Sequence, residues 1–241
     1  MTFMEGTDWY ATNYDDKYRQ GQGITRSDVN YDGINVYGDE ASGNLKAVGQ
    51  TLAEKGLIPA SAVNLLPNYY VSRTGYNEVD LTNNRAANTK IDFSFHLRPL
   101  GDERLEVIWQ SKFGFGNAVY QGANRYYLNN FYMSQHKLEI KGKNFFVRGY
   151  TTTEDGGKSY DMLFTGLNVN RAWKDDRTWF GQYAGAFVQA TLSGQTPENA
   201  HLISRSVADT GRFLPGTPEF KNAFNQVIAN PDVLSGSKLV D

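Results

Sequence analysis

Apolar and polar residues alternate with a period of two through residues 89–152, the middle of the chain. Every second residue from Ile91 to Leu97 is apolar, and the alternation returns from Leu105 to Phe115. Pro99–Asp102, between the two runs, is rich in turn-forming residues. Because successive side chains of a strand point to opposite faces, the pattern predicts an antiparallel hairpin. Its apolar face should carry Ile91, Phe93, Phe95, Leu97, Leu105, Val107 and Trp109.

A second hairpin is predicted directly after the first. Its strands are expected at Leu128–Ile140 and Asn144–Tyr150, with Gly142 in a tight turn. Asn117–Tyr127, which joins the hairpins, is expected to be a longer loop, so that tight turns lie at one end of the sheet and long loops at the other. The alternation places His136 on the face of Tyr132 and Leu138, an unfavourable position for an imidazole if that face contacts lipid, unless the residue lies near the membrane interface or the register slips there.

The flanking segments have a different pattern. Residues 8–88 are polar and rich in Asn, Asp, Gly and Tyr, with one helical stretch at Leu45–Glu54. After residue 152 the apolar spacing approaches 3.6, which predicts helices at Tyr160–Trp173 and Thr178–Leu192. A further helix should begin after Thr217, with Pro218 in its first turn, and end near Ala229. The chain thus divides into residues 1–88, 89–152 and 153–241, and the predicted fold class is mainly β with partly helical insertions.

Composition excludes several classes of protein. The 241 residues include no Cys, so disulfides and thiolate metal sites are impossible. A formal net charge of −2 is not that of a dedicated nucleic-acid binder. The chain is hydrophilic on average, with a mean hydropathy of −0.54, yet it contains 15 Tyr, 14 Phe and 4 Trp. This combination favours β-structure with one apolar face over a large aliphatic core.

Two interpretations of the predicted sheet remain open on pattern alone. One is a soluble sheet with one wet face, which would make the protein a calcium-stabilised binding module of the kind that recognises glycans. The other is part of an outer-membrane β-barrel. Predicted strands of ten or more residues exceed the ~5–6 typical of soluble sheets and match the ~9–11 that cross a bilayer. Aromatic residues near strand ends, and short turns alternating with long loops, also favour the barrel.

Particular motifs strengthen the second interpretation. They occur in order along nearly the whole chain, at Gly6–Trp9, Asp28–Glu40, Arg73–Tyr76, His136–Arg148 and Asn170–Trp173. In these segments the sequence resembles TonB-dependent outer-membrane receptors of the SusC-like, carboxypeptidase-regulatory-domain type found in Bacteroidetes.

The resemblance implies a 22-stranded transmembrane barrel in the outer membrane that imports a nutrient, such as a glycan, peptide or siderophore-like molecule, with energy delivered by TonB. Phe3–Gly6 would end one strand, and residues 8–88 and 153–241 would be extracellular loops. Such receptors also have a plug and many more strands, so the sequence is expected to be a fragment or one chain of a split receptor. Its implied partners are the plug and other strands, TonB, membrane lipid and a SusD-like surface lipoprotein, with no nucleic acid.

One segment has the spacing of a calcium-binding loop. Such a loop needs oxygen ligands at alternate positions, a glycine turn and a carboxylate at the twelfth position. Gly33 supplies the turn, and Glu40 is an alternative to the carboxylate at position twelve. The predicted ligands are Asp28, Asn30, Asp32, the carbonyl of Ile34, and Asp39 or Glu40. A polar loop closed by Asx turns would give the same letters, and no flanking EF-hand helices are evident.

Other chemical motifs point away from catalysis. Gly156–Ser159 lacks the first glycine of a phosphate-binding loop and is expected to be a turn. His96, His136 and His201 lack the spacing of a metal site or a catalytic triad, and Asp175–Asp176 is expected to cap a helix or face solvent. We therefore expect no enzyme. Loop aromatics could stack on a ligand or pack within the loops: Trp9, Tyr37, Tyr69, Tyr70, Trp173 and Trp179.

Overall fold

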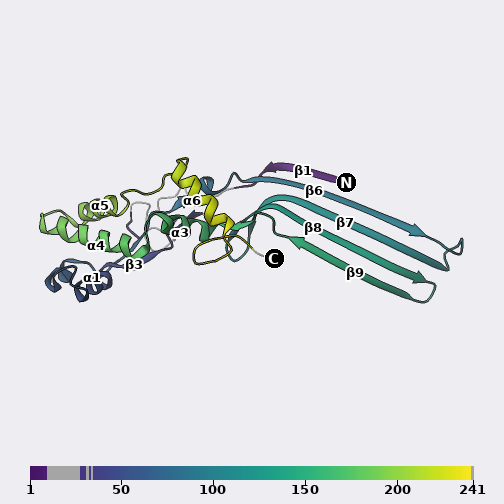
Figure 1. Ribbon diagram of the computed structural model, residues 1–241, viewed down its shortest axis with the longest axis horizontal. Helices are drawn as coiled ribbons and strands as arrows, with labels where there is room; N and C mark the ends of the chain where they lie inside the picture. The colour runs from purple at the N-terminus through teal and green to yellow at the C-terminus, as the bar shows by residue number, and fades with distance from the viewer. Residues whose placement is uncertain (10–27, 31–32, 34, 240–241) are drawn as a thin grey trace. The chain divides into compact units, whose positions relative to one another are not determined.

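The computed structural model describes residues 1–9, 28–30, 33 and 35–239, which form two compact units (Figure 1). The sheet unit comprises Met1–Trp9, Thr82–Asp161 and Lys238–Asp241. The helical unit comprises Tyr10–Leu81 and Met162–Ser237. The fold is mainly β with antiparallel sheets, as the alternation predicted, and carries helical insertions.

The sheet unit is built on long antiparallel strands that lie side by side in Figure 1. Neighbours in the sheet follow the order β1-β6-β7-β8-β10, and β9 also pairs with β8. β7 and β8 have 17 and 18 residues, well beyond the ~5–6 of an average strand. The strands are β1 (Thr2–Thr7), β6 (Arg85–Leu97), β7 (Leu105–Gln121), β8 (Arg125–Gly142), β9 (Phe146–Asp155) and β10 (Tyr160–Asp161).

The register confirms the predicted face. Phe95 pairs with Trp109, which pairs with Leu138 on its other side. Directly paired residues of an antiparallel sheet project to the same face, so the apolar side chains of three strands share one surface. His136 lies on this surface as predicted, paired with Ser111.

The prediction of a long loop at Asn117–Tyr127 is wrong. β7 continues to Gln121 and β8 begins at Arg125, which leaves only residues 122–124 as a turn. The register shifts between Gly116 and Ala118, where a bulge interrupts the alternation of side chains. That interruption removed the period-two signal and made paired strand ends resemble a loop.

Two long insertions leave this sheet and return to a neighbouring strand. The first separates β1 from β6, where Thr7 pairs with Arg85. The second follows β10, and its end returns to the sheet where Lys238 pairs antiparallel with Tyr160. Each insertion therefore interrupts a connection between adjacent strands and leaves their pairing intact. β1 corresponds to the strand predicted at Phe3–Gly6.

The helical unit combines residues from both insertions. The first contributes α1 (Leu45–Glu54), η1 (Ala60–Leu65), α2 (Glu78–Leu81) and two small ladders, β2 (Val36–Tyr37) with β5 (Tyr76–Asn77) and β3 (Ser42–Asn44) with β4 (Tyr70–Ser72). The second contributes α3 (Met162–Trp173), α4 (Asp176–Leu192), α5 (Pro197–Ala208) and α6 (Pro218–Ala229). α1 and α6 have the predicted bounds, and the hydroxyl of Thr217 accepts from the amide of Phe220 as the N-cap.

Arg73 joins the two insertions in the core of the helical unit. Its side chain is 1% exposed and lies within 6 Å of the ring centroids of Trp173 and Trp179. Nη1 donates to Oδ1 of Asp176 at 2.7 Å, and Nη2 to the carbonyl of Asn170 at 3.2 Å. Burial lowers the pKa of Arg73 from its ordinary value, while the bond to Asp176 opposes that shift.

Replacing Arg73 with Met should therefore destabilise the helical unit. The change leaves Asp176 without its buried partner, and we expect a loss of about 3 kcal/mol in the free energy of unfolding. Urea unfolding followed by tryptophan fluorescence measures it. Arg171→Met is the matched control, because Arg171 contacts the same carboxylate at 3.0 Å from a half-exposed position. It should cost less than about 1 kcal/mol, and equal losses would contradict a special role for Arg73.

Candidate functional site

The apolar face of the sheet is the most prominent surface of the described residues. Its large side chains are solvent-exposed: Phe95 is 59% exposed, Trp109 48% and Leu138 54%. A contiguous apolar patch of this kind marks a surface that contacts a partner or a membrane. Across the sheet it comprises Ile91, Phe93, Phe95, Leu97, Leu105, Val107, Trp109, Phe113, Phe115, Tyr132, Leu138, Ile140 and Val147.

The height of this face can be compared with a bilayer. On β7 it extends from Leu105 to Phe115, eleven residues whose ends lie about 33 Å apart along the strand. A strand tilted by the ~35–45° typical of outer-membrane barrels projects that length onto about 25 Å. This is the height of the lipid-facing band of such barrels. β7 and β8 are longer than the band, so their ends extend past it.

Three polar residues near the middle of the apolar face, Ser111, Ser134 and His136, are hydrogen-bonded or buried. Oγ of Ser111 lies 2.8 Å from Nδ1 of His136, and the ring of Phe113 contacts the imidazole edge-on. Ser111 and Ser134 are buried beneath their larger neighbours. A polar group that is paired in this way costs far less in an apolar environment than an unpaired one. The position of His136 is therefore compatible with a lipid-facing surface.

The opposite face of the sheet is charged. Oε2 of Glu139 accepts from Lys137 at 3.2 Å and from Arg148 at 3.0 Å. Glu106 contacts His96 across the pair of strands, at 3.2 Å. Alternation of an apolar face with an ion-paired polar face is the pattern of a barrel wall, apolar outside and polar inside.

The described part of the predicted calcium loop is closed by hydrogen bonds within the protein. Oδ2 of Asp39, which is buried, accepts from the amide of Gly33 at 2.9 Å, and Oδ1 of Asn30 accepts from Ser72 at 3.0 Å. Oε2 of Glu40 accepts from the amide of Gly38, and Asp28 is half-buried. Asp32 and Ile34 lie outside the described residues. Calcium binding by Asp28, Asn30, Asp32, Ile34, Asp39 and Glu40 stays a prediction.

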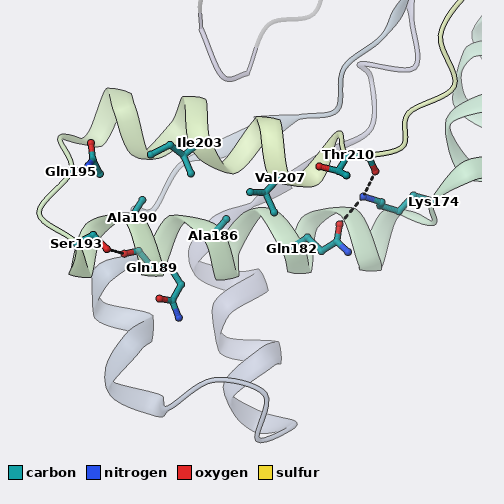
Figure 2. A pocket seen from close by; sticks show the side chains of 10 residues that line it. All are labelled: Lys174, Gln182, Ala186, Gln189, Ala190, Ser193, Gln195, Ile203, Val207 and Thr210. Atoms are coloured by element: carbon teal, nitrogen blue, oxygen red, sulfur yellow. Dashed lines mark hydrogen bonds between the residues drawn. The ribbon is translucent and has the colours of Figure 1, made fainter.

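The helical unit has a groove of 880 Å³ between α4 and α5 (Figure 2). Ala186, Ala190, Ile203 and Val207 give it apolar walls, and glutamine amides line its rim. At one end Nζ of Lys174 donates to Oε1 of Gln182 at 2.6 Å and to the carbonyls of Ala208 and Thr210, and burial lowers the pKa of Lys174. The ammonium thus caps the end of α5, and the groove offers mainly apolar and amide surface.

The loop aromatics divide between packing and exposure. Trp179 is fully buried and Tyr37 nearly so, so both serve the core of the helical unit. Trp9, Tyr69 and Tyr70 are exposed. Asp175 caps α4, which is one of the two roles predicted for it: its carboxylate accepts from the amide of Thr178 at 2.9 Å.

A scan against protein-family models, a search of the curated proteins and a search of the solved structures each find no match. No helix among the described residues is long and apolar enough to span a membrane. The sequence pattern located the apolar face, whereas the role of Arg73 required the structure, because its partner Asp176 is 103 residues away.

Calcium should raise the melting temperature of the helical unit if the 28–40 loop binds it. The ion would hold carboxylates together that otherwise repel one another. Thermal unfolding in millimolar CaCl₂ is compared with unfolding in excess EGTA. Asp28→Asn should abolish most of the difference, and Asp102→Asn, in an exposed turn of the sheet unit, should leave it unchanged. Equal melting temperatures with calcium and with chelator would contradict calcium binding by this loop.

Acid should loosen α5 from α4 through His201. Its Nδ1 lies 3.0 Å from the hydroxyl of Tyr183, and its ring packs 4.7 Å from that of Phe187. Burial, then Arg205, lowers the pKa of His201 below 6.5, and Glu198 opposes them weakly. The neutral ring is favoured in the fold, so its contribution is complete above pH 6.5 and is lost as the pH falls through the lowered pKa.

This contribution can be measured as the free energy of urea unfolding between pH 7 and pH 5. We expect it to fall with pH, and to fall less in His201→Asn, which cannot gain a proton. His96→Asn is the control, since that exposed histidine lies in the sheet unit. Identical pH profiles for the wild type and His201→Asn would contradict this assignment.

Proposed function

We propose that this protein forms part of the wall of a TonB-dependent outer-membrane β-barrel that takes up a nutrient. The observation that carries the proposal is the apolar face, about 25 Å high, opposite an ion-paired polar face. In the proposed 22-stranded receptor the first would face lipid and the second the lumen. The motifs that resemble SusC-like receptors give the same assignment independently.

The two insertions support an uptake role in this arrangement. In outer-membrane barrels, long segments join neighbouring strands on the extracellular side, whereas short turns join them on the periplasmic side. The connections at residues 98–104 and 143–145 are short, and both large insertions leave the sheet at the other strand ends, where residues 122–124 also form a short turn. We propose that the helical unit is extracellular and contributes to the substrate vestibule, with the plug, TonB and a SusD-like lipoprotein as partners of the complete receptor.

A soluble, calcium-stabilised binding module is the competing function. It would keep the helical unit as its ligand-binding part and would need another explanation for the aromatic face of the sheet. Apolar residues scattered singly over a soluble surface need no explanation, but an ordered band of apolar residues across four strands needs one.

A charge placed on the apolar face should oppose entry into lipid. Phe93 lies near the middle of the band, paired with Ser111, and its neighbour Ser94 projects to the opposite face. Phe93→Arg should weaken partition of the purified chain into phospholipid vesicles by about 2–4 kcal/mol, at least ~30-fold, whereas Ser94→Arg should change it little. Partition is measured by flotation of the vesicles in a density gradient.

Trp109 reports the orientation directly. A variant that keeps Trp109 and has Phe at residues 9, 173 and 179 should be quenched by lipids brominated on their acyl chains. A matched variant that keeps only Trp173 should be quenched far less. A chain that is monomeric without detergent, and whose Trp109 is insensitive to brominated lipid, would overturn the proposed function.

A further inference from the structure

The groove between α4 and α5 arises from a difference in side-chain size between the two helices. α5 packs toward the core through three small residues that are fully buried: Ala200, Ser204 and Ala208. Ile203 and Val207 lie beside this buried stripe and are 40% and 43% exposed. Figure 2 shows them facing Ala186 and Ala190 of α4. The groove therefore has two apolar sides, a tall one on α5 and a low one on α4.

Residues of both insertions support the groove from behind. α4 packs against α1 and η1 of the first insertion as well as against α5. Buried side chains of the two insertions share one core on that side: Leu45, Ala62, Leu66, Trp179, Phe180 and Phe187. The shape of the groove is therefore set by the packed core of the helical unit.

Polar groups lie at both ends of the groove. Gln182 and Thr210 are at one end, and Ser193 and Gln195 are at the other (Figure 2). A glutamine amide offers both hydrogen-bond donors and an acceptor. Lys174 is the only charged residue of the ten that line the groove, and its ammonium already donates to Gln182 and to two backbone carbonyls. The groove thus offers hydrogen bonds without a free charge.

This chemistry argues against several classes of ligand. No acidic or aromatic side chain is among the ten lining residues, so a metal ion lacks carboxylate ligands and a sugar ring lacks an aromatic face to stack on. An anion lacks a free cation. An α-helix keeps its backbone hydrogen bonds internal, so its backbone could not pair with the glutamine amides. The groove suits an occupant that combines apolar side chains with exposed backbone groups.

We propose that the groove binds an extended peptide segment with an apolar side chain at every second position. In an extended chain, side chains on the same side lie about 6.7 Å apart. Ala186 and Ala190 on α4 are four residues apart, about 6 Å along the helix, and so are Ile203 and Val207 on α5. Because the repeats are similar, successive inward side chains of the peptide can each contact both helices.

The groove also defines how much of the peptide it holds. From Gln182 to Ser193, α4 rises by about 16 Å, which about five extended residues span. Since the lining residues offer no free charge, the charged ends of the peptide lie outside the groove, which binds the middle of a longer chain. As a substrate site the groove rests on the proposed uptake function and makes the nutrient a peptide, whereas peptide binding itself requires only the helical unit.

Calorimetric titration of the full 241-residue chain in detergent micelles tests the proposal. The probe is a seven-residue peptide of alternating Ser and Val, with Ser at both ends and with acetyl and amide caps. One control peptide has the same composition with its three Val consecutive, and a second is N-methylated at each Val. Both controls should bind about tenfold more weakly, because the first divides its Val between two sides and the second lacks backbone donors.

Ala186→Leu should block the groove. The larger side chain occupies the space opposite Ile203, and Leu is a good helix former, so α4 should keep its structure. We expect the alternating peptide to bind about tenfold more weakly, the effect of losing one apolar side chain's contacts. Ala172→Leu is the matched control, because Ala172 is an exposed residue of α3 outside the groove. Circular dichroism checks that both variants keep their helix content.

A photoreactive peptide locates the site without any change to the protein. Photo-leucine replaces the central Val of the probe, and irradiation is followed by mass spectrometry of the protease fragments. The crosslinks should fall within residues 174–210, which contain the groove. This measurement keeps the proposal testable if Ala186→Leu fails to fold.

Three results would overturn the inference. They are equal binding of the alternating and N-methylated peptides, equal binding by the wild type and a folded Ala186→Leu, and crosslinks outside residues 174–210. Preferential binding of maltoheptaose would assign the groove to a glycan, and a concentration-dependent dimer lost in Ala186→Leu would assign it to a second copy of the chain. Either result would also overturn the peptide assignment.

These outcomes are separate from a failure of the proposed function. A chain that binds the peptide in the groove, but whose Trp109 is insensitive to brominated lipid, would keep the peptide site and lose the membrane assignment. Quenching of Trp109 without peptide binding would do the reverse.

Discussion

The register between β6, β7 and β8 is the constraint on which the rest of the sheet depends. Because side chains alternate with a period of two, a slip of one residue in any strand would move its aromatic residues to the charged face. Two kinds of contact oppose such a slip. Phe93 meets Trp109 edge-on at 5.4 Å on the apolar face, while His96 and Glu106 contact each other across the same two strands, at 3.2 Å, on the other. The sheet is therefore specified from both sides, although neither face is packed.

This arrangement makes the sheet dependent on its surroundings. A soluble sheet gains stability by burying one face against a second layer, and the large residues of this one remain exposed. Ser111 and His136 lie on this exposed face, where they bond to each other and Ser111 is buried beneath its larger neighbours. Polar groups that pair with each other in this way are suited to a solvent that offers no hydrogen bonds, and hydrocarbon is such a solvent.

The two insertions do not depend on their surroundings in this way, because together they form a buried core of their own. Arg73, from the first insertion, lies between two tryptophans and bonds to an aspartate and a carbonyl of the second. Either insertion alone would leave half of that cluster exposed. The helical unit should thus fold as one body and present one continuous surface. Substrate specificity in the proposed receptor would then arise from the pair of insertions rather than from either loop separately.

Sequence patterns predicted the parts of this structure whose signals are local. α1, the N-cap of α6 and the face shared by Ile91 and Trp109 depend on neighbouring residues, and the structure has them where the pattern placed them. The Asn117–Tyr127 segment was misread because a bulge changes the phase of the alternation without ending the strand. The partner of Arg73 is 103 residues distant, and a lone arginine in a polar loop gives no signal of its burial.

The same distinction bears on the calcium motif. Its ligand spacing is a local signal, of the kind that succeeded for caps and strands, but three of its side chains also have partners within the protein. Asp39 accepts from the turn glycine itself, Asn30 accepts from Ser72, and Glu40 accepts from the amide of Gly38. A carboxylate or amide oxygen has two lone pairs, so these bonds orient the oxygens without consuming them. Orientation of the ligands by a second set of bonds is what a metal site of useful affinity requires. The hydrogen bonds that would close the loop without an ion are thus the same bonds that would orient its oxygens for calcium. Only the response to added calcium therefore distinguishes a loop closed by hydrogen bonds from a calcium-binding loop.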